Sequence, residues 1–147
     1  MENKIRIEME ALPENEGFAR VAVAAFITYL NPTVEEITDV KTAVSEAVTN
    51  AVIHAYGEKG GKIVIRCDLQ GDLLHIEVED AGKGIENVEQ AMVPLYTTRP
   101  DLERSGMGFA FMEAFMDSLE VESETGKGTL VIMEKKLGNG PWIPDEE

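Results

Sequence analysis

Residues 46–54 read EAVTNAVIH and residues 80–84 read DAGKG. The first stretch spaces Glu46, Asn50 and His54 four residues apart. In a helix this spacing places an acid, an amide and an imidazole on one side, within reach of a common ligand. Asp80 ends an alternating apolar run, and glycines follow it two and four residues later. Together the two stretches predict a nucleotide-binding site.

Apolar periodicity divides the rest of the chain into short elements. Alternation of apolar and charged residues predicts an edge strand at residues 4–10. Thr33 and Glu36 form a capping-box pattern, so a helix is expected from residue 33 to about residue 55. The other expected elements are a helix at 14–30, a hairpin of strands at 62–69 and 73–80, a short helical piece at 87–92, a helix at 109–116, and strands at 118–123 and 129–135. This order predicts an α/β two-layer sandwich, whose mixed and mostly antiparallel sheet carries helices on one face.

The composition is strongly acidic. Thirteen Lys and Arg residues stand against 28 Asp and Glu residues, which gives a formal net charge of −15. Such a charge repels a phosphate backbone, so direct nucleic-acid binding is not expected. A chain of this size buries roughly 70% of its unfolded surface, enough for one core. We therefore expect one domain at residues 1–137, followed by a loose tail at 138–147 that contains Trp142.

Cysteine usage and hydropathy indicate the compartment. Cys67 is the single cysteine and lies in an apolar run, which suits core packing in a reducing cytosol. The longest apolar run, residues 21–30, falls short of the roughly 20 residues that span a bilayer. The sequence therefore predicts a soluble, cytoplasmic protein without a membrane partner.

The expected helix at 14–30 has apolar residues on two sides. Phe18 and Val21 belong to one stripe, and Ala19 and Val23 belong to the other. This is more apolar surface than one core contact requires. Arg20 is the only charge within this apolar stretch. Two interpretations of Arg20 stay open, a solvated arginine or a contact with an acidic surface on a partner.

The loops around the expected hairpin and the last helix also carry signals. Asp80 ends a row of inward-facing side chains, so its carboxylate needs hydrogen-bond donors to offset its desolvation. Gly82 and Gly84 would let the next loop bring its backbone against a flat ring. Residues 94–105 are polar and contain two prolines, which predicts a mobile lid. Gly106-Met107-Gly108 then opens a helix whose free N-terminal amides attract anionic oxygens such as phosphates.

Each signal also has an ordinary structural explanation. A row at four-residue spacing on a long helix is usually a solvated face, and His54 alone is more often a packing residue. Asp80 followed by glycines is a common strand-ending turn, and Gly106-x-Gly108 can be a flexible joint. The order favours function, because helix row, strand-end acid, lid and glycine helix start follow one another as a single nucleotide site requires.

These motifs resemble the four boxes of the GHKL ATPase superfamily, which has the Bergerat fold and includes gyrase, Hsp90, MutL and the histidine kinases. The residues that carry the resemblance are the Glu46…Asn50 helix, Asp80-x-Gly82-x-Gly84, Gly106-x-Gly108 and Gly128-Thr129. Within the superfamily, residues 44–51 and 94–109 are similar to the serine kinases that act as sporulation anti-sigma factors. The likeness covers about residues 5–136. The chain departs from this pattern at Tyr96, Arg99, Asp101 and the pair Ala110-Phe111.

The resemblance implies an ATP-dependent protein serine kinase with Mg²⁺ as cofactor. Glu46 would be the catalytic base and Asn50 would hold the metal ion. Asp80 would accept a hydrogen bond from the adenine amino group, with Thr129 beside it. The nucleotide-binding residues implied by the resemblance are Asn50, His54, Asp80, Gly82, Gly84, Thr98, Arg104, Ser105, Gly106, Met107, Gly108, Phe109 and Thr129.

The resemblance also implies partners. They are an RNA polymerase sigma factor, which the chain would hold as a homodimer, and a small anti-anti-sigma protein that it would phosphorylate on a serine. Arg20 is the residue we predict to bind a partner. Two alternatives stay open, a related stress-response anti-sigma serine kinase and a nucleotide-gated sigma binder without phosphotransfer.

Overall fold

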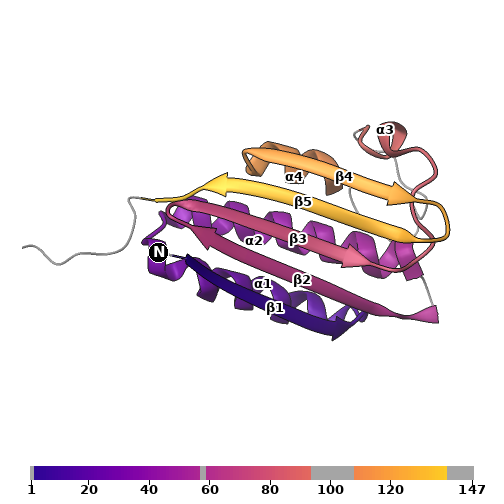
Figure 1. Cartoon of the computed structure of the whole chain (residues 1–147), viewed down its shortest axis with the longest axis horizontal. Coiled ribbons are helices and arrows are strands. Elements are labelled where there is room, and N and C mark those ends of the chain that lie inside the picture. Colours follow the sequence, from indigo (N-terminus) through magenta and orange to yellow (C-terminus); the bar gives the residue numbers. More distant parts are fainter. Residues whose placement is uncertain (1, 57–58, 94–107, 139–147) are drawn as a thin grey trace, which may run out of the picture.

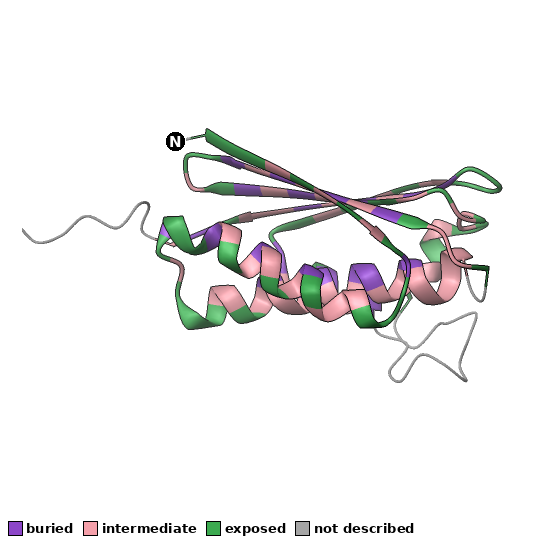
Figure 2. Cartoon of the chain, turned by 90° about the horizontal axis from the view of Figure 1, so that it is seen from below, coloured by how far each residue is buried: buried purple, intermediate pink, exposed green. Residues whose placement is uncertain are grey.

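The computed structural model describes residues 2–56, 59–93 and 108–138. These ranges form two layers, a five-stranded sheet and helices packed on one of its faces (Figure 1, Figure 2). The strands are β1 (Glu2–Glu10), β2 (Lys62–Gln70), β3 (Leu73–Asp80), β4 (Ser118–Glu124) and β5 (Gly128–Lys136). The helices are α1 (Glu14–Ile27), α2 (Val34–Asn50), α3 (Val88–Ala91) and α4 (Gly108–Phe115), with a 3-10 turn η1 (Thr28–Leu30) and a π-helical turn η2 (Ala51–Tyr56). The predicted two-layer α/β sandwich is confirmed.

The sheet has the strand order β1-β2-β3-β5-β4, so β1 lies at an edge as predicted (Figure 1). Every neighbouring pair of these described strands is antiparallel, whereas the sequence predicted a mixed, mostly antiparallel sheet. The two antiparallel helices α1 and α2 return the chain to the end of the sheet where β1 finished, so β2 runs opposite to β1.

Alternation along the strands separates the core from the open face of the sheet. In β2, residues 63, 65, 67 and 69 are buried while those between them are partly exposed. Leu74, Ile76 and Val78 of β3 face the same helical layer. Cys67 lies in this core, which confirms its predicted packing role, and burial raises the pKa of its thiol to about 12.

Helix α2 begins with the predicted capping box. The Glu36 N–H donates to Thr33 Oγ1 at 3.0 Å, and the Thr33 N–H donates to Glu36 Oε1 at 2.8 Å. One apolar stripe of this helix is buried, at Val40, Val44, Ala47 and Val48, and it continues at Ala51 in η2. Regular α-helix stops at Asn50, and the chain continues to Tyr56 as a π-helical turn, a feature frequent at functional sites.

Helix α1 uses one of its two apolar stripes for the core. Ala19 and Val23 are fully buried. Phe18 and Val21, from the other stripe, are 62% and 60% exposed. The helix therefore packs on the sheet and α2 through one side and presents apolar side chains to solvent on the other.

A charged network covers the open face of the sheet. The ring nitrogens of His75 lie 2.8 Å from Glu134 Oε2 and 2.8 Å from Glu77 Oε2. Partial burial acts to lower the pKa of His75, but the hydrogen bonds to both carboxylates outweigh it and raise this pKa. The His75 hydrogen bond is also the main reason that the pKa of Glu77 is lowered. His75 and its neighbours thus form a charge-paired row across β3 and β5.

The C-terminal end of the described chain returns to the start of α2. The Gly138 N–H donates to Glu36 Oε2 at 2.8 Å. Residues 139–147, with Trp142, lie outside the described residues, so the predicted domain end at residue 137 stays a prediction. Within the described ranges, none of the helices combines the length and apolar character that a membrane span requires.

Candidate functional site

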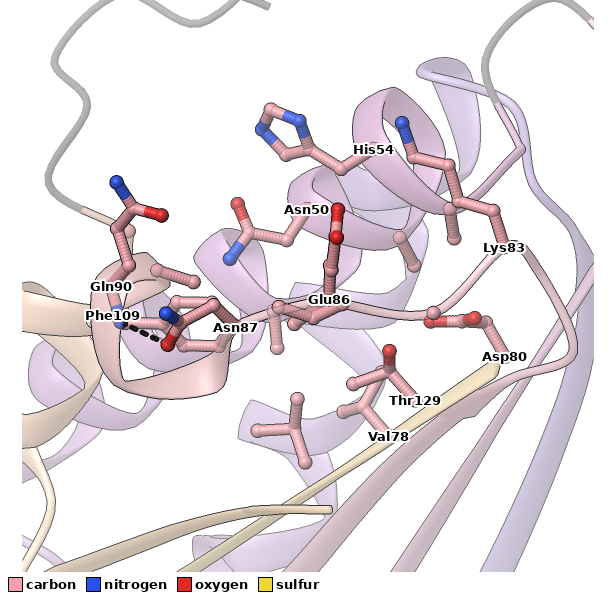
Figure 3. A pocket seen from close by; sticks show the side chains of 18 of the residues that line it. Asn50, His54, Val78, Asp80, Lys83, Glu86, Asn87, Gln90, Phe109 and Thr129 are labelled. Atoms are coloured by element: carbon pink, nitrogen blue, oxygen red, sulfur yellow. Dashed lines mark hydrogen bonds between the residues drawn. The ribbon is translucent and has the colours of Figure 1, made fainter. Parts of the chain in front are cut away.

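A cavity of about 680 Å³ lies between the helical layer and the ends of β3 and β5 (Figure 3). Its walls come from the end of α2, η2, the loop after β3, α3, the start of α4 and the β4–β5 turn. Seven of the predicted site residues line it: Asn50, His54, Asp80, Gly84, Gly108, Phe109 and Thr129. Residues distant in the sequence therefore meet at one cavity, as their order suggested.

The other predicted residues divide into two groups. Glu46 lies on α2 one turn before Asn50 and is half-buried, and it does not line the cavity. Gly82 also does not line it. Thr98, Arg104, Ser105, Gly106 and Met107, together with the predicted lid, lie outside the described residues.

Asp80 closes one end of the cavity. It is the last residue of β3, and its Cα partner on β5 is Thr129. Asp80 Oδ1 accepts a hydrogen bond from the Gly82 N–H at 3.0 Å. Burial raises the pKa of Asp80, against the opposing effect of backbone hydrogen bonds from Gly82 and Thr129. The result is a partly desolvated carboxylate that favours a ligand carrying hydrogen-bond donors.

The loop after Asp80 is held against the helical layer. The Tyr56 hydroxyl accepts from the Ala81 N–H at 2.6 Å and donates to the Lys62 carbonyl at 2.7 Å. The Lys83 N–H donates to the Ala55 carbonyl at 3.0 Å. Tyr56 was not predicted from the sequence, because its bond to Ala81 joins residues 25 positions apart and no local pattern marks it.

The same loop is also held by the β4–β5 turn. The Gly126 N–H donates to the Lys83 carbonyl at 2.7 Å, and the Ile85 N–H donates to Ser123 Oγ at 2.7 Å. The loop is therefore fixed on both sides before any ligand arrives. Ser123 is a second residue that sequence reasoning missed.

Three glycines permit close approach around the cavity. A Cβ at Gly82 would collide with the carbonyl oxygen of Ala55, and one at Gly84, where φ is +77°, would collide with that of Glu124. A Cβ at Gly108 would stand 3.0 Å from Asn50 Oδ1. Gly82 thus serves the packing of the loop on η2, whereas Gly84 and Gly108 also border the cavity.

The cavity contains few charges. Among its described lining residues, Lys83 is the only lysine or arginine. Asp80 and Glu86 are the acids. No cluster of three or more His, Cys, Asp or Glu suited to a metal ion occurs in the described parts of the chain. A metal ion here would need ligand atoms from a bound molecule in addition to protein groups.

A family model described as the histidine kinase-like ATPase domain matches residues 9–135. The fold and this match place the chain in the class of histidine kinase-like ATPase domains. Proteins named anti-sigma F factor are 62% identical to it: that of Clostridium acetobutylicum over 137 residues (93% of this chain and 96% of the relative), and that of Clostridium perfringens strain SM101 over 138 residues (93% and 99%). The chain belongs to the anti-sigma F factor family of histidine kinase-like ATPase domains.

Solved structures share the fold at lower identity. The RsbU and RsbW domains of Rv1364c from Mycobacterium tuberculosis align with a TM-score of 0.69 and 21% identity, covering 99% of this chain and 35% of that one. The mycobacterial sensor histidine kinase MprB aligns with a TM-score of 0.57 and 14% identity, covering 94% of this chain and 100% of that one. At these identities the likeness establishes the fold alone.

Proposed function

We propose that this chain is an anti-sigma factor with protein serine kinase activity. It binds ATP with Mg²⁺, holds a sporulation sigma factor of RNA polymerase, and phosphorylates a serine of a small anti-anti-sigma protein. The observation that carries the proposal is the cavity, where Asp80 and Asn50 face the same space from different elements. It occurs in a chain that is 62% identical to proteins named anti-sigma F factor.

The adenine base is proposed to lie at the Asp80 end. Asp80 accepts hydrogen bonds and is partly desolvated, which strengthens a bond to the adenine amino group. Val78 and Val131 line the cavity beside it and supply apolar contact for the ring. The volume of about 680 Å³ lies within the roughly 300–1,000 Å³ typical of ligand pockets, so it suits a nucleotide.

The phosphates are proposed to lie toward Asn50 and the start of α4. The absence of a side chain at Gly108 brings the α4 backbone close to the Asn50 amide. Asn50 offers a hard oxygen ligand, which suits Mg²⁺, an ion that prefers oxygen and keeps several waters. Among the described lining residues, two acids stand against one lysine, so a cation bound with the polyphosphate would offset charge repulsion on this side of the cavity. When bound, Mg²⁺ would neutralise phosphate charge.

Glu46 is proposed as the general base. It would accept the proton of the substrate serine hydroxyl while the serine oxygen bonds to the γ-phosphorus and the bond to the β-phosphate oxygen breaks, releasing ADP. Glu46 lies one helical turn before Asn50 and does not line the cavity, so its proposed role requires the protein substrate to bring its serine to this border of the cavity. The predicted lid residues Arg104 and Ser105 would add charge and backbone donors to the phosphates.

Helix α1 is proposed to contact the protein partners. Arg20 Nη1 lies 3.5 Å from Glu16 Oε1, and its side chain is 41% exposed. Phe18 and Val21 on the same helix are exposed apolar residues. The pair is only partly exposed, and ion pairs at this helical spacing contribute about 0.3–0.5 kcal/mol, so Arg20 can exchange Glu16 for an acid on a partner. The same apolar surface is available for a second copy of the chain in the proposed homodimer.

The Arg20 role is tested by charge reversal. Arg20→Glu should weaken capture of a sigma factor in a pull-down while the ATP dissociation constant stays the same. Arg6→Glu is the control, because Arg6 is exposed on the open face of β1, opposite the face that the helical layer covers. Unchanged capture by Arg20→Glu would remove Arg20 from the proposed interface.

Nucleotide control needs no mechanism beyond mass action. If ATP and ADP favour different arrangements of the lid, each nucleotide stabilises the arrangement that one partner prefers. The ratio of ATP to ADP would then select between the sigma factor and the anti-anti-sigma protein.

Phosphotransfer from γ-labelled ATP to candidate anti-anti-sigma proteins tests the kinase proposal. The wild-type protein should transfer the label to a serine of the anti-anti-sigma protein. Glu46→Gln should bind ATP normally but transfer the label at least about 100-fold more slowly, which is the lower end of the effect expected for loss of a general base. Equal labelling by both proteins would overturn the assignment of Glu46. ATP binding and sigma capture without labelling of any partner would favour the nucleotide-gated binder.

A further inference from the structure

The Ser123 side chain contacts two parts of the cavity wall beside the proposed adenine position, the loop after β3 and the start of β5. It lies on β4 directly opposite Thr129 of β5, and both residues point into the helical layer. Ser123 Oγ lies 2.7 Å from the Ile85 nitrogen, 3.0 Å from the Gly128 carbonyl oxygen and 2.8 Å from Thr129 Oγ1. One hydroxyl thus contacts the loop after β3, the β4–β5 turn and the side chain beside Asp80.

The protons of these bonds can be assigned from chemistry. A serine hydroxyl has one hydrogen to donate and two lone pairs to accept with. The Ile85 N–H can only donate and the Gly128 carbonyl can only accept, so they use one lone pair and the single hydrogen of Ser123. The remaining lone pair requires that Thr129 be the donor. This is the single assignment that satisfies all of these contacts.

The assignment determines what Thr129 offers to a ligand. Its only hydrogen points at Ser123, so the Thr129 oxygen faces the cavity with a lone pair alone. Figure 3 shows the Thr129 side chain beside Asp80, and the two residues are Cα partners across β3 and β5. An ionised Asp80 likewise accepts and does not donate. This end of the cavity therefore holds two acceptors and no side-chain donor from this pair.

We propose that Ser123 is a positioning residue that sets the purine selectivity of the site, by fixing the Thr129 hydroxyl as an acceptor. A purine with an amino group at position 6 supplies donors to both acceptors. A purine with a keto oxygen there meets two acceptors and is rejected, since unpaired buried polar groups are costly. The inference rests on the proposed ATP binding and adds the residue that determines which base is admitted.

The test compares ATP with inosine triphosphate, which differs from ATP by a 6-keto group and the hydrogen on ring nitrogen 1. Calorimetry gives both dissociation constants for wild type, Ser123→Ala and Ser123→Thr, with thermal melting to verify folding. Loss of Ser123 frees the Thr129 hydroxyl to donate to the keto oxygen. The ratio of the two constants should then narrow by about tenfold in Ser123→Ala, near the upper value of one neutral hydrogen bond. Ser123→Thr keeps a hydroxyl and should keep the wild-type ratio.

The ratio of the dissociation constants for ATP and inosine triphosphate distinguishes a role of Ser123 in selectivity from a purely structural role. If Ser123 only fixed the loop through Ile85, both nucleotides would weaken together and the ratio would not change. A narrowing of less than about twofold would therefore refute the inference, because even a weak neutral hydrogen bond is worth slightly more than that. Ser123→Cys replaces Ser123→Ala if the latter does not fold, since a thiol is a weak acceptor.

A double variant tests whether Ser123 acts on nucleotide selectivity through Thr129. In Thr129→Val the hydroxyl is absent, so adding Ser123→Ala should leave the ratio unchanged, whereas narrowing there would show that Ser123 acts through another group. Wild type that binds no ATP would refute the proposed function itself. Wild type that binds ATP with an unchanged ratio in Ser123→Ala would refute only this inference.

Discussion

Replacement of Asp80 by asparagine tests the base end of the cavity without changing its shape. Asp80 Oδ1 accepts the Gly82 N–H at 3.0 Å, so the carboxamide oxygen of Asp80→Asn should keep that place. Its NH₂ group then occupies the position of the second carboxylate oxygen. A donor would thus face the adenine amino group, which is itself a donor.

The expected loss follows from the bond that is replaced. A hydrogen bond to a charged group contributes about 1.5–3 kcal/mol, so the ATP dissociation constant should rise about 10- to 150-fold in Asp80→Asn. The free energy of unfolding should not fall. Burial raises the pKa of Asp80, which means that the folded protein disfavours the charged form, and the amide removes that penalty.

Calorimetry with ATP and Mg²⁺ measures the loss, and urea unfolding measures stability. Glu79→Gln is the matched control, since it makes the same change one residue earlier, on the exposed face where Glu79 pairs with Arg66 at 3.1 Å. Its ATP affinity should equal that of wild type. An Asp80→Asn affinity within threefold of wild type, or an equal loss in Glu79→Gln, would contradict the proposed orientation of the base.

The remaining predictions concern stability and use chemical unfolding. Leu74→Ala should lower the free energy of unfolding by about 2–5 kcal/mol because Leu74 is fully buried. Leu73→Ala should lower it much less, because Leu73 is partly exposed. Equal losses of stability would contradict the assigned face of β3. The pKa of His75 is raised in the folded protein above its unfolded value of about 6.5. The stabilisation from its charge is therefore complete below about pH 6 and lost as the pH rises through the raised folded pKa, so the difference in unfolding free energy between wild type and His75→Gln should shrink as the pH rises above about 6. A difference that grows with pH would have the wrong sign.

Much of the fold follows from local patterns. The alternation in residues 62–80 places each side chain of the β2–β3 hairpin on its observed face. The capping box at Thr33 sets the start of α2, because both of its bonds lie within four residues. Asp80 was expected at the end of an inward row, and the structure places it at the cavity.

Other features depend on tertiary contacts that no local pattern contains. Both sides of α1 are apolar, so only packing against the sheet and α2 decides that Ala19 is buried and Phe18 is exposed. Tyr56 and Ser123 fix the loop after β3 through bonds that span 25 and 38 residues. The spacing of Glu46 and Asn50 was visible in the sequence, but not that the cavity wall includes Asn50 and omits Glu46.

The central claim is that the cavity between α2, α4 and the ends of β3 and β5 binds ATP with Mg²⁺. Titration of the isotopically labelled protein, followed by the backbone amide resonances, tests it residue by residue. The account predicts saturable shifts at Asn50, Gly84, Gly108 and Thr129, with little change at Arg66 on the open face of the sheet. Amide positions around the cavity that stay unchanged at millimolar ATP, or shifts confined to the open face, would contradict it.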